Sequence, residues 1–170
     1  VIPAKDEAKR LPPFLEKVIA FCLSSRYRYE IIIMEDGSCD DTYAAAGAFH
    51  PCFPGLKVVR NSRNHGKGFA VRQGFFEAAG DVLLFLDADG SVEPDEIEKN
   101  LHYLSEGYDI VAGSRQLAST EAVRRIKLSR RIIGRTFHFF VRIFSGVPVS
   151  DTQCGFKMFT RRAVDEIFPL

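Results

Sequence analysis

Short apolar runs and longer amphipathic stretches alternate along the chain. The apolar runs cover residues 1–3, 29–34, 56–60, 82–86 and 109–112. The stretches between them have apolar side chains at helical spacing and cover residues 9–24, 40–49, 66–79 and 94–106. Strands that alternate with helices predict an α/β fold, in which a mostly parallel sheet lies between layers of helices.

A polar or glycine-rich turn follows each predicted strand. These turns are residues 5–7, 35–38, 64–66, 87–91 and 113–115. The carboxyl ends of parallel strands lie at the same edge of a sheet, where ligands of α/β proteins usually bind. We therefore expect the five turns to line one crevice.

The fourth predicted strand ends in two carboxylates, Asp87 and Asp89, in the sequence VLLFLDADGS. Carboxylates at this spacing can hold a divalent cation together with substrate phosphates and water. A capped turn is the simpler interpretation, because Asp side chains accept hydrogen bonds from nearby main-chain N–H groups. Phosphatases of the haloacid dehalogenase type use a similar motif, but there it follows the first strand, which argues against that class.

A long helix is predicted over residues 123–144, where no acidic residue occurs. Its apolar stripe consists of Ile126, Ile133, Phe137, Phe140 and Phe144. Its opposite face is basic and consists of Arg124, Lys127, Arg131, Arg135, His138 and Arg142. This pattern fits a core helix with a solvated face or a basic amphipathic helix at an anionic membrane surface. Arg130 lies toward the apolar side, where its charge needs a partner such as an anion.

Composition limits the function classes. The chain has 170 residues, of which 46% are hydrophobic, so we expect residues 1–170 to form one domain, as a fragment truncated at both ends. The formal charge of +1 gives no indication of nucleic-acid binding. The four cysteines of the chain lack the spacing of a metal site, which favours reduced thiols in a domain that faces the cytosol. No apolar run reaches the roughly 18 residues of a transmembrane helix.

The order of the motifs resembles a known family. The motifs are VIPAKDE (1–7), MEDGSCDDT (34–42), NHGKGFAVRQG (64–74), DADGS (87–91), GSR (113–115) and DTQCGFKMFTRRA (151–163). Together they resemble the inverting glycosyltransferases of family 2, which have the Rossmann-like GT-A fold. Among these, the chain is most similar to the dolichyl-phosphate β-glucosyltransferases. It departs from the pattern at Lys5, where relatives commonly have Tyr, and at Glu35, where they have Asp.

The resemblance implies a binding site for a nucleotide sugar. One part of this site would hold the base and ribose of the nucleotide, and another part would hold its diphosphate and the sugar. The residues implied are Pro3, Lys5, Glu7, Met34, Asp36, Lys67, Asp87, Ala88 and Asp89. It also implies a Mg²⁺ or Mn²⁺ ion, whose ligands would be Asp87, Asp89 and Ser91.

The acceptor implied by the resemblance is a dolichyl or polyprenyl phosphate. Arg115 and Arg130 would hold its phosphate, because a planar guanidinium can donate two hydrogen bonds to one phosphate. Together with Asp89 and Asp151 they form the expected catalytic set. The expected reaction transfers glucose from UDP-glucose with inversion and gives polyprenyl-phosphate β-glucose. The expected location is a membrane surface facing the cytosol, at the endoplasmic reticulum of a eukaryote or the plasma membrane of a prokaryote.

Two alternatives stay open from the sequence. One is transfer of mannose from GDP-mannose, or of another sugar by a related family 2 enzyme. The other is a non-catalytic subunit that binds a nucleotide sugar or a lipid and retains the fold. The intact Asp87, Asp89, Arg115 and Arg130 favour an enzyme.

Overall fold

The computed structural model describes residues 1–114 and 154–169. Residues 1–111 and 155–169 belong to one compact unit. The predicted basic helix over residues 123–144 lies outside the described residues. Within the described ranges, no helix is long and apolar enough to cross a membrane.

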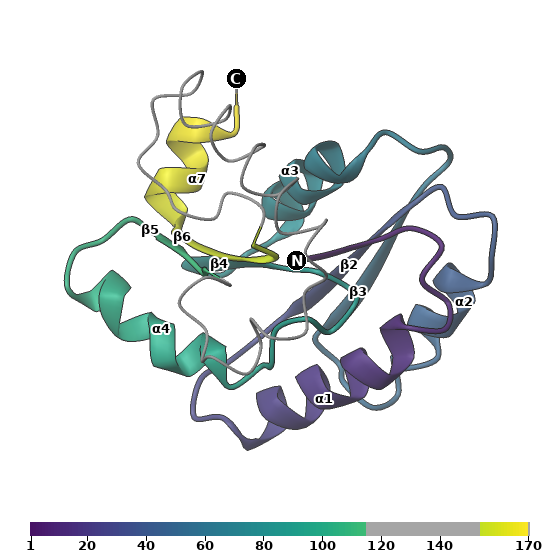
Figure 1. Ribbon diagram of the computed structural model, residues 1–170, viewed down its shortest axis with the longest axis horizontal. Coiled ribbons are helices and arrows are strands. Elements are labelled where there is room, and N and C mark those ends of the chain that lie inside the picture. Colours follow the sequence, from purple (N-terminus) through teal and green to yellow (C-terminus); the bar gives the residue numbers. More distant parts are fainter. Residues whose placement is uncertain (115–153, 170) are drawn as a thin grey trace, which may run out of the picture. The chain divides into compact units, whose positions relative to one another are not determined.

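The described strands form two three-stranded sheets, of which the first is parallel, as predicted. It consists of β1 (Ile2–Ala4), β2 (Ile31–Asp36) and β3 (Leu56–Asn61), in the order β1-β2-β3 (Figure 1). Ile2 pairs with Ile33, and Ile31 pairs with Leu56. All six residues of β2 are buried, because the strand is central and both faces of the sheet are covered.

The second three-stranded sheet contains an antiparallel strand that the sequence pattern did not predict. Its strands are β4 (Val82–Leu86), β5 (Ile110–Ala112) and β6 (Phe156–Thr160), in the order β4-β6-β5. β4 and β6 are antiparallel, with Leu84 opposite Met158. The main-chain N–H of Leu86 donates to the carbonyl of Val1 at 3.0 Å, so the end of β4 lies beside the start of β1.

Helices cover both faces of the sheet, in agreement with the predicted layers. They are α1 (Leu11–Ser24), α2 (Thr42–Gly47), α3 (Lys67–Glu77), α4 (Glu96–Ser105) and α7 (Arg161–Ile167). In Figure 1, α1, α2 and α4 lie on one side of the sheet and α3 and α7 on the other. The layers place the carboxyl ends of β1 to β4 at one exposed edge.

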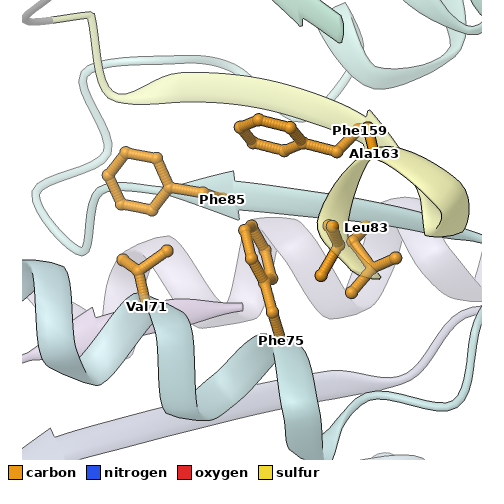
Figure 2. Close-up of a cluster of buried hydrophobic side chains, with 7 residues drawn as sticks. Val71, Phe75, Leu83, Phe85, Phe159 and Ala163 are labelled. Atoms are coloured by element: carbon orange, nitrogen blue, oxygen red, sulfur yellow. The ribbon is translucent and has the colours of Figure 1, made fainter. Parts of the chain in front are cut away.

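The core between α3, β4 and α7 is rich in aromatic side chains (Figure 2). Phe75 of α3 and Phe159 of β6 pack edge to face, with ring centroids 5.4 Å apart. The cluster of buried residues is Val71, Phe75, Leu83, Phe85, Phe159, Ala163 and Val164. Gly74 brings α3 close to the first strands, because a Cβ there would lie 2.4 Å from Val1 Cγ1 and 2.9 Å from Met34 Cγ.

Two arginines join α3 and α7 through the ends of these helices. Arg161 donates to the carbonyls of Ala78 and Gly80, each at 2.7 Å, just beyond the carboxyl end of α3. Arg72 of α3 donates in turn to the carbonyl of Phe168 at 2.5 Å, just beyond α7. Carbonyls at helix ends lack partners within the helix. Each arginine therefore satisfies main-chain acceptors at the end of the other helix.

We predict that Arg161→Ala destabilises the protein. A hydrogen bond from a charged donor typically contributes about 1.5–3 kcal/mol, so we expect the free energy of unfolding to fall by about 3 kcal/mol. Urea unfolding followed by circular dichroism measures this change. Arg162→Ala is the matched control, because Arg162 is exposed and pairs with the exposed carboxylate of Asp109. Equal losses for the two variants would contradict the capping role of Arg161.

Candidate functional site

A cleft of ≈ 390 Å³ lies at the carboxyl ends of β1, β2 and β4, beside the start of α3. Four of the five predicted turns contribute to it. Its lining residues are Pro3, Ala4, Lys5, Glu7, Arg10, Asp36, Asn64, Gly66, Lys67, Ala70, Asp87, Ala88 and Asp89. They include every residue of the predicted nucleotide-sugar site except Met34.

Met34 and Ser91 lie outside the lining of the cleft. The Met34 side chain is fully buried, and in the sheet register the residue is opposite Pro3. Ser91 is exposed, and its main-chain N–H donates to Asp89 Oδ1 at 2.9 Å. Met34 thus lies in the core beside a cleft residue, and Ser91 contacts a cleft residue through its main chain.

Asp87 and Asp89 form the acidic side of the cleft. The ammonium group of Lys67 lies 2.5 Å from Asp87 Oδ1, which shows that the local charge favours a cation beside this carboxylate. Among the described residues, no group of three or more His, Cys, Asp or Glu side chains is arranged to hold a metal ion. Two carboxylates fit a divalent cation that takes its other ligands from phosphates and water, as Mg²⁺ commonly does.

The start of α3 forms the side of the cleft opposite these carboxylates. Gly66 precedes the helix and has φ +91°, a conformation that favours glycine. Because glycine has no side chain, no side-chain hydrogen bond caps the start of α3 at this position. N–H groups in the first turn of a helix lack helical partners and attract anions. Together with the Lys67 ammonium, they make this side of the cleft suitable for a phosphate.

Asp36 holds the loop that leads into α3. Its carboxylate accepts hydrogen bonds from Asn61 Nδ2 at 3.0 Å, from the His65 N–H at 3.0 and 3.1 Å, and from the Gly66 N–H at 2.7 Å. Burial by itself raises the pKa of this carboxyl, but these hydrogen bonds outweigh it, so that the pKa of Asp36 is lowered. The ionised group supports the position of Gly66 and Lys67 in addition to lining the cleft.

The loop between β1 and α1 is fixed by the motif SCDDT. The main-chain N–H groups of residues 6, 7 and 8 donate hydrogen bonds to side chains of residues 38, 42 and 40, respectively. The pairs are Asp6 with Ser38 Oγ (3.1 Å), Glu7 with Thr42 Oγ1 (2.8 Å) and Ala8 with Asp40 Oδ2 (3.1 Å). In return, Asp6 Oδ1 accepts a hydrogen bond from the Cys39 N–H at 2.8 Å. This part of the motif supports the loop that carries Lys5 and Glu7.

Glu35 is a supporting residue. Its side chain is fully buried at the end of β2, where it accepts a hydrogen bond from the Ser38 N–H. Its second oxygen pairs with Arg60 Nε at 3.1 Å. Glu at this position therefore stabilises the turn after β2 instead of facing the cleft.

The predicted residues of the acceptor site, Arg115, Arg130 and Asp151, lie outside the described residues. Their roles stay predictions. The structure adds Arg10 and Asn64 to the cleft. Arg10 could have been found from its spacing, since it follows Glu7 by three residues and pairs with it at 2.7 Å.

Comparison with known proteins identifies a family and similar sequences. The sequence pattern of Glycosyl transferase family 2 matches residues 1–168. A Saccharomyces cerevisiae protein named dolichyl-phosphate beta-glucosyltransferase is 36% identical over 188 residues, covering 99% of this chain and 56% of the relative. The Drosophila melanogaster protein of the same name is 35% identical over 181 residues, with coverages of 99% and 56%. The chain thus spans about half the length of these curated relatives.

Solved glycosyltransferase structures have the same fold. A Pyrobaculum calidifontis mannosyltransferase in complex with GDP-Man and Mn²⁺ has a TM-score of 0.67 at 18% identity, covering 98% of this chain and 45% of that structure. Glucosyl-3-phosphoglycerate synthase from Mycobacterium tuberculosis, in complex with Mn²⁺, UDP-Glc and phosphoglyceric acid, has a TM-score of 0.64 at 21% identity, covering 95% and 55%. These similarities confirm the predicted GT-A fold.

We predict that Asp36→Asn destabilises the protein in a pH-dependent way. An amide at this position presents an NH₂ group to main-chain donors, so we expect a loss of about 2 kcal/mol at pH 7. Because the pKa of Asp36 is lowered on folding, its ionised form stabilises the protein above about pH 4. This contribution disappears as the pH falls through the folded-state pKa.

The measurement is urea unfolding of the wild-type protein and of the Asp36→Asn variant between pH 7 and pH 2. The difference in stability between them should be constant at high pH and shrink below about pH 4. Asp95→Asn is the control, because Asp95 is exposed and its side chain makes no capping hydrogen bond to α4. A difference that stays constant down to pH 2 would contradict the supporting role of the ionised Asp36 carboxylate.

Proposed function

Because the chain belongs to glycosyltransferase family 2, we propose that it contains the catalytic domain of a polyprenyl-phosphate glucosyltransferase. The names of the similar full-length proteins support this substrate class. The observation that carries the proposal is the cleft itself. It brings together Pro3, Lys5, Glu7, Asp36, Lys67 and the DAD sequence at residues 87–89, which are far apart in the chain.

The proposed donor is UDP-glucose. Its base and ribose would bind between Pro3, Lys5 and Glu7, in the loop that residues 38–42 support. Its diphosphate would bind between the start of α3 and the two carboxylates. This orientation follows from charge, because the cationic side of the cleft is at Lys67 and the first turn of α3.

Asp87 and Asp89 are the proposed ligands of Mg²⁺ or Mn²⁺. Bound there with the donor, the ion would stabilise the negative charge that develops on the departing nucleoside diphosphate. The protein groups that act with it are the Lys67 ammonium and the first-turn N–H groups of α3. These groups hold the diphosphate so that the anomeric carbon of the sugar faces the acceptor.

The proposed acceptor is the phosphate of a polyprenol. The second pKa of a phosphate monoester is about 6, so the group is mostly dianionic at neutral pH and already nucleophilic. It needs little help from a general base, and the protein chiefly positions it. We propose Arg115 and Arg130 as its cationic partners, and Asp151 as a group that orients sugar hydroxyls or an arginine.

The chemistry is a single displacement at the anomeric carbon. A phosphate oxygen of the acceptor forms a bond to this carbon as the bond to the nucleoside diphosphate breaks. Attack from the face opposite the leaving group inverts an α-linked donor and gives a β-linked sugar phospholipid. Because the acceptor is a lipid, the reaction takes place at a membrane surface, and we propose that the active site faces the cytosol.

The proposal predicts metal-dependent glucose transfer by the full-length protein in membranes. We expect radiolabel to enter polyprenyl phosphate from UDP-glucose with Mg²⁺ or Mn²⁺, and chelation to abolish the transfer. Asp89→Asn should reduce the rate at least a hundredfold, since it removes a carboxylate that acts on the transition state. Asp95→Asn is the matched control and should retain the rate.

Four outcomes would contradict the proposal in different ways. Label from GDP-mannose alone would make the chain part of a mannosyltransferase. The absence of label from both donors would favour a non-catalytic binding subunit. Full activity of the Asp89→Asn variant, or activity that survives chelation, would contradict the proposed metal site.

Lys67→Gln is predicted to weaken use of the donor more than use of the acceptor. Loss of one charged contact to a phosphate corresponds to about a tenfold effect, so we expect the KM for UDP-glucose to rise about tenfold. The KM for polyprenyl phosphate should change less than twofold. Lys17→Gln is the control, because Lys17 is exposed and pairs with Glu93 on the surface. Equal changes in both KM values would contradict the phosphate role of Lys67.

A further inference from the structure

Gly155 lies directly opposite Asp87, the first carboxylate of the cleft. Leu86 is the last residue of β4 and pairs with Phe156, the first residue of β6. The main-chain N–H of Asp87 then donates to the carbonyl of Gly155 at 3.1 Å, so the antiparallel pairing continues one residue further. Opposite residues in an antiparallel pair project from the same face of the sheet. The side chain of Asp87 and the missing side chain of Gly155 therefore share one space.

The carboxylate of Asp87 occupies that space. A Cβ atom on residue 155 would lie 2.2 Å from Asp87 Oδ2, 2.5 Å from its Cγ and 2.9 Å from its Cβ. All three separations are far below van der Waals contact, so the side chain of Asp87 rests directly on the main chain of Gly155. The other carboxylate oxygen, Oδ1, pairs with Lys67. One oxygen thus faces Gly155 while the other faces the diphosphate side of the cleft.

We propose that Gly155 is a positioning residue for Asp87 in metal and donor binding. It acts by having no side chain, which leaves room for the observed orientation, in which Asp87 Oδ1 pairs with Lys67. This inference rests on the proposed function, because it assumes that Asp87 binds the ion and the diphosphate. Gly155 itself is not among the described residues that line the cleft.

The structure indicates that an added methyl group would disturb the site more than the fold. Gly155 is absent from the glycines with positive φ, so alanine can adopt its main-chain conformation. The three nearest atoms that a Cβ would meet belong to one side chain, that of Asp87. Rotation about the Cα–Cβ bond of Asp87 moves its Oδ2 and Cγ away, but it turns the carboxylate away from Lys67. The contact with Asp87 Cβ at 2.9 Å persists after rotation and requires a shift of the main chain.

Two other glycines provide matched comparisons. Gly37 has φ +66°, and a Cβ there would lie 2.4 Å from the carbonyl carbon of Arg63 and 2.5 Å from the Asn64 nitrogen. Those atoms are main chain and cannot rotate away, so Gly37→Ala should reduce stability. At Gly47 a Cβ would meet no atom of the described residues within 4 Å, so Gly47→Ala should change neither stability nor binding.

The test compares Gly155→Ala, Gly37→Ala and Gly47→Ala in the full-length protein. Binding of Mn²⁺ in the presence of UDP is measured by electron paramagnetic resonance, and stability by thermal unfolding. Changes around metal ligands typically reduce metal affinity by about 10–100-fold, so we expect at least a tenfold loss for Gly155→Ala. Its Tm should fall less than that of Gly37→Ala, because the three nearest atoms that a Cβ at Gly37 would meet all belong to the main chain.

A double variant isolates the role of Asp87. If Gly155 acts through Asp87, adding Gly155→Ala to Asp87→Ala should cause no further loss of UDP affinity, because the two changes are coupled. Wild-type protein that binds no Mn²⁺ with UDP would contradict the proposed function itself. Three results would overturn the positioning role alone. They are Mn²⁺ binding that Gly155→Ala leaves unchanged, a fall in Tm for Gly155→Ala as large as that for Gly37→Ala, and additive losses of UDP affinity in the double variant.

Discussion

The geometry of the cleft depends on one buried carboxylate, that of Asp36 at the end of β2. It accepts hydrogen bonds from the side chain of Asn61 and from the main-chain N–H groups of His65 and Gly66. These contacts connect the end of β2, the end of β3 and the start of α3. Because α3 begins directly after Gly66, they also determine where Lys67 lies relative to Asp87. A single satisfied anion thus fixes the start of α3, which forms one side of the proposed diphosphate site.

Several acidic residues of the motifs support the main chain around the cleft. Asp36 and Asp40 accept hydrogen bonds from the main chain and keep the loops in place. Glu35 does the same from a fully buried position. Asp87 and Asp89 line the cleft, as Asp36 also does, and Asp87 pairs with the Lys67 ammonium group. Loops at the end of a parallel sheet leave many main-chain N–H groups without ladder partners, and short acidic and hydroxyl side chains can satisfy them.

The pattern of apolar and polar residues predicts those features of the structure that depend on residues close together in the sequence. The apolar runs predict β1 to β5 and the order of turns predicts the cleft, because parallel strands have their carboxyl ends at one edge. Strand β6 was missed, since its five residues lie in a motif that resembles a binding site and show no clear alternation. The supporting role of Asp36 and the proximity of Gly155 to Asp87 depend on pairing between distant segments, which periodicity does not encode.

Charge in the cleft explains why a divalent cation suits the proposed donor site. Glu7 is paired with Arg10, and the carboxylate of Asp36 is satisfied by main-chain and amide donors. Of the remaining described lining groups on the diphosphate side, Asp87 and Asp89 are anionic and Lys67 is cationic. A diphosphate that enters this region brings further negative charge next to carboxylates, and like charges at close range repel. A divalent ion between the carboxylates and the diphosphate turns that repulsion into attraction, so binding of the donor and of the metal should depend on each other.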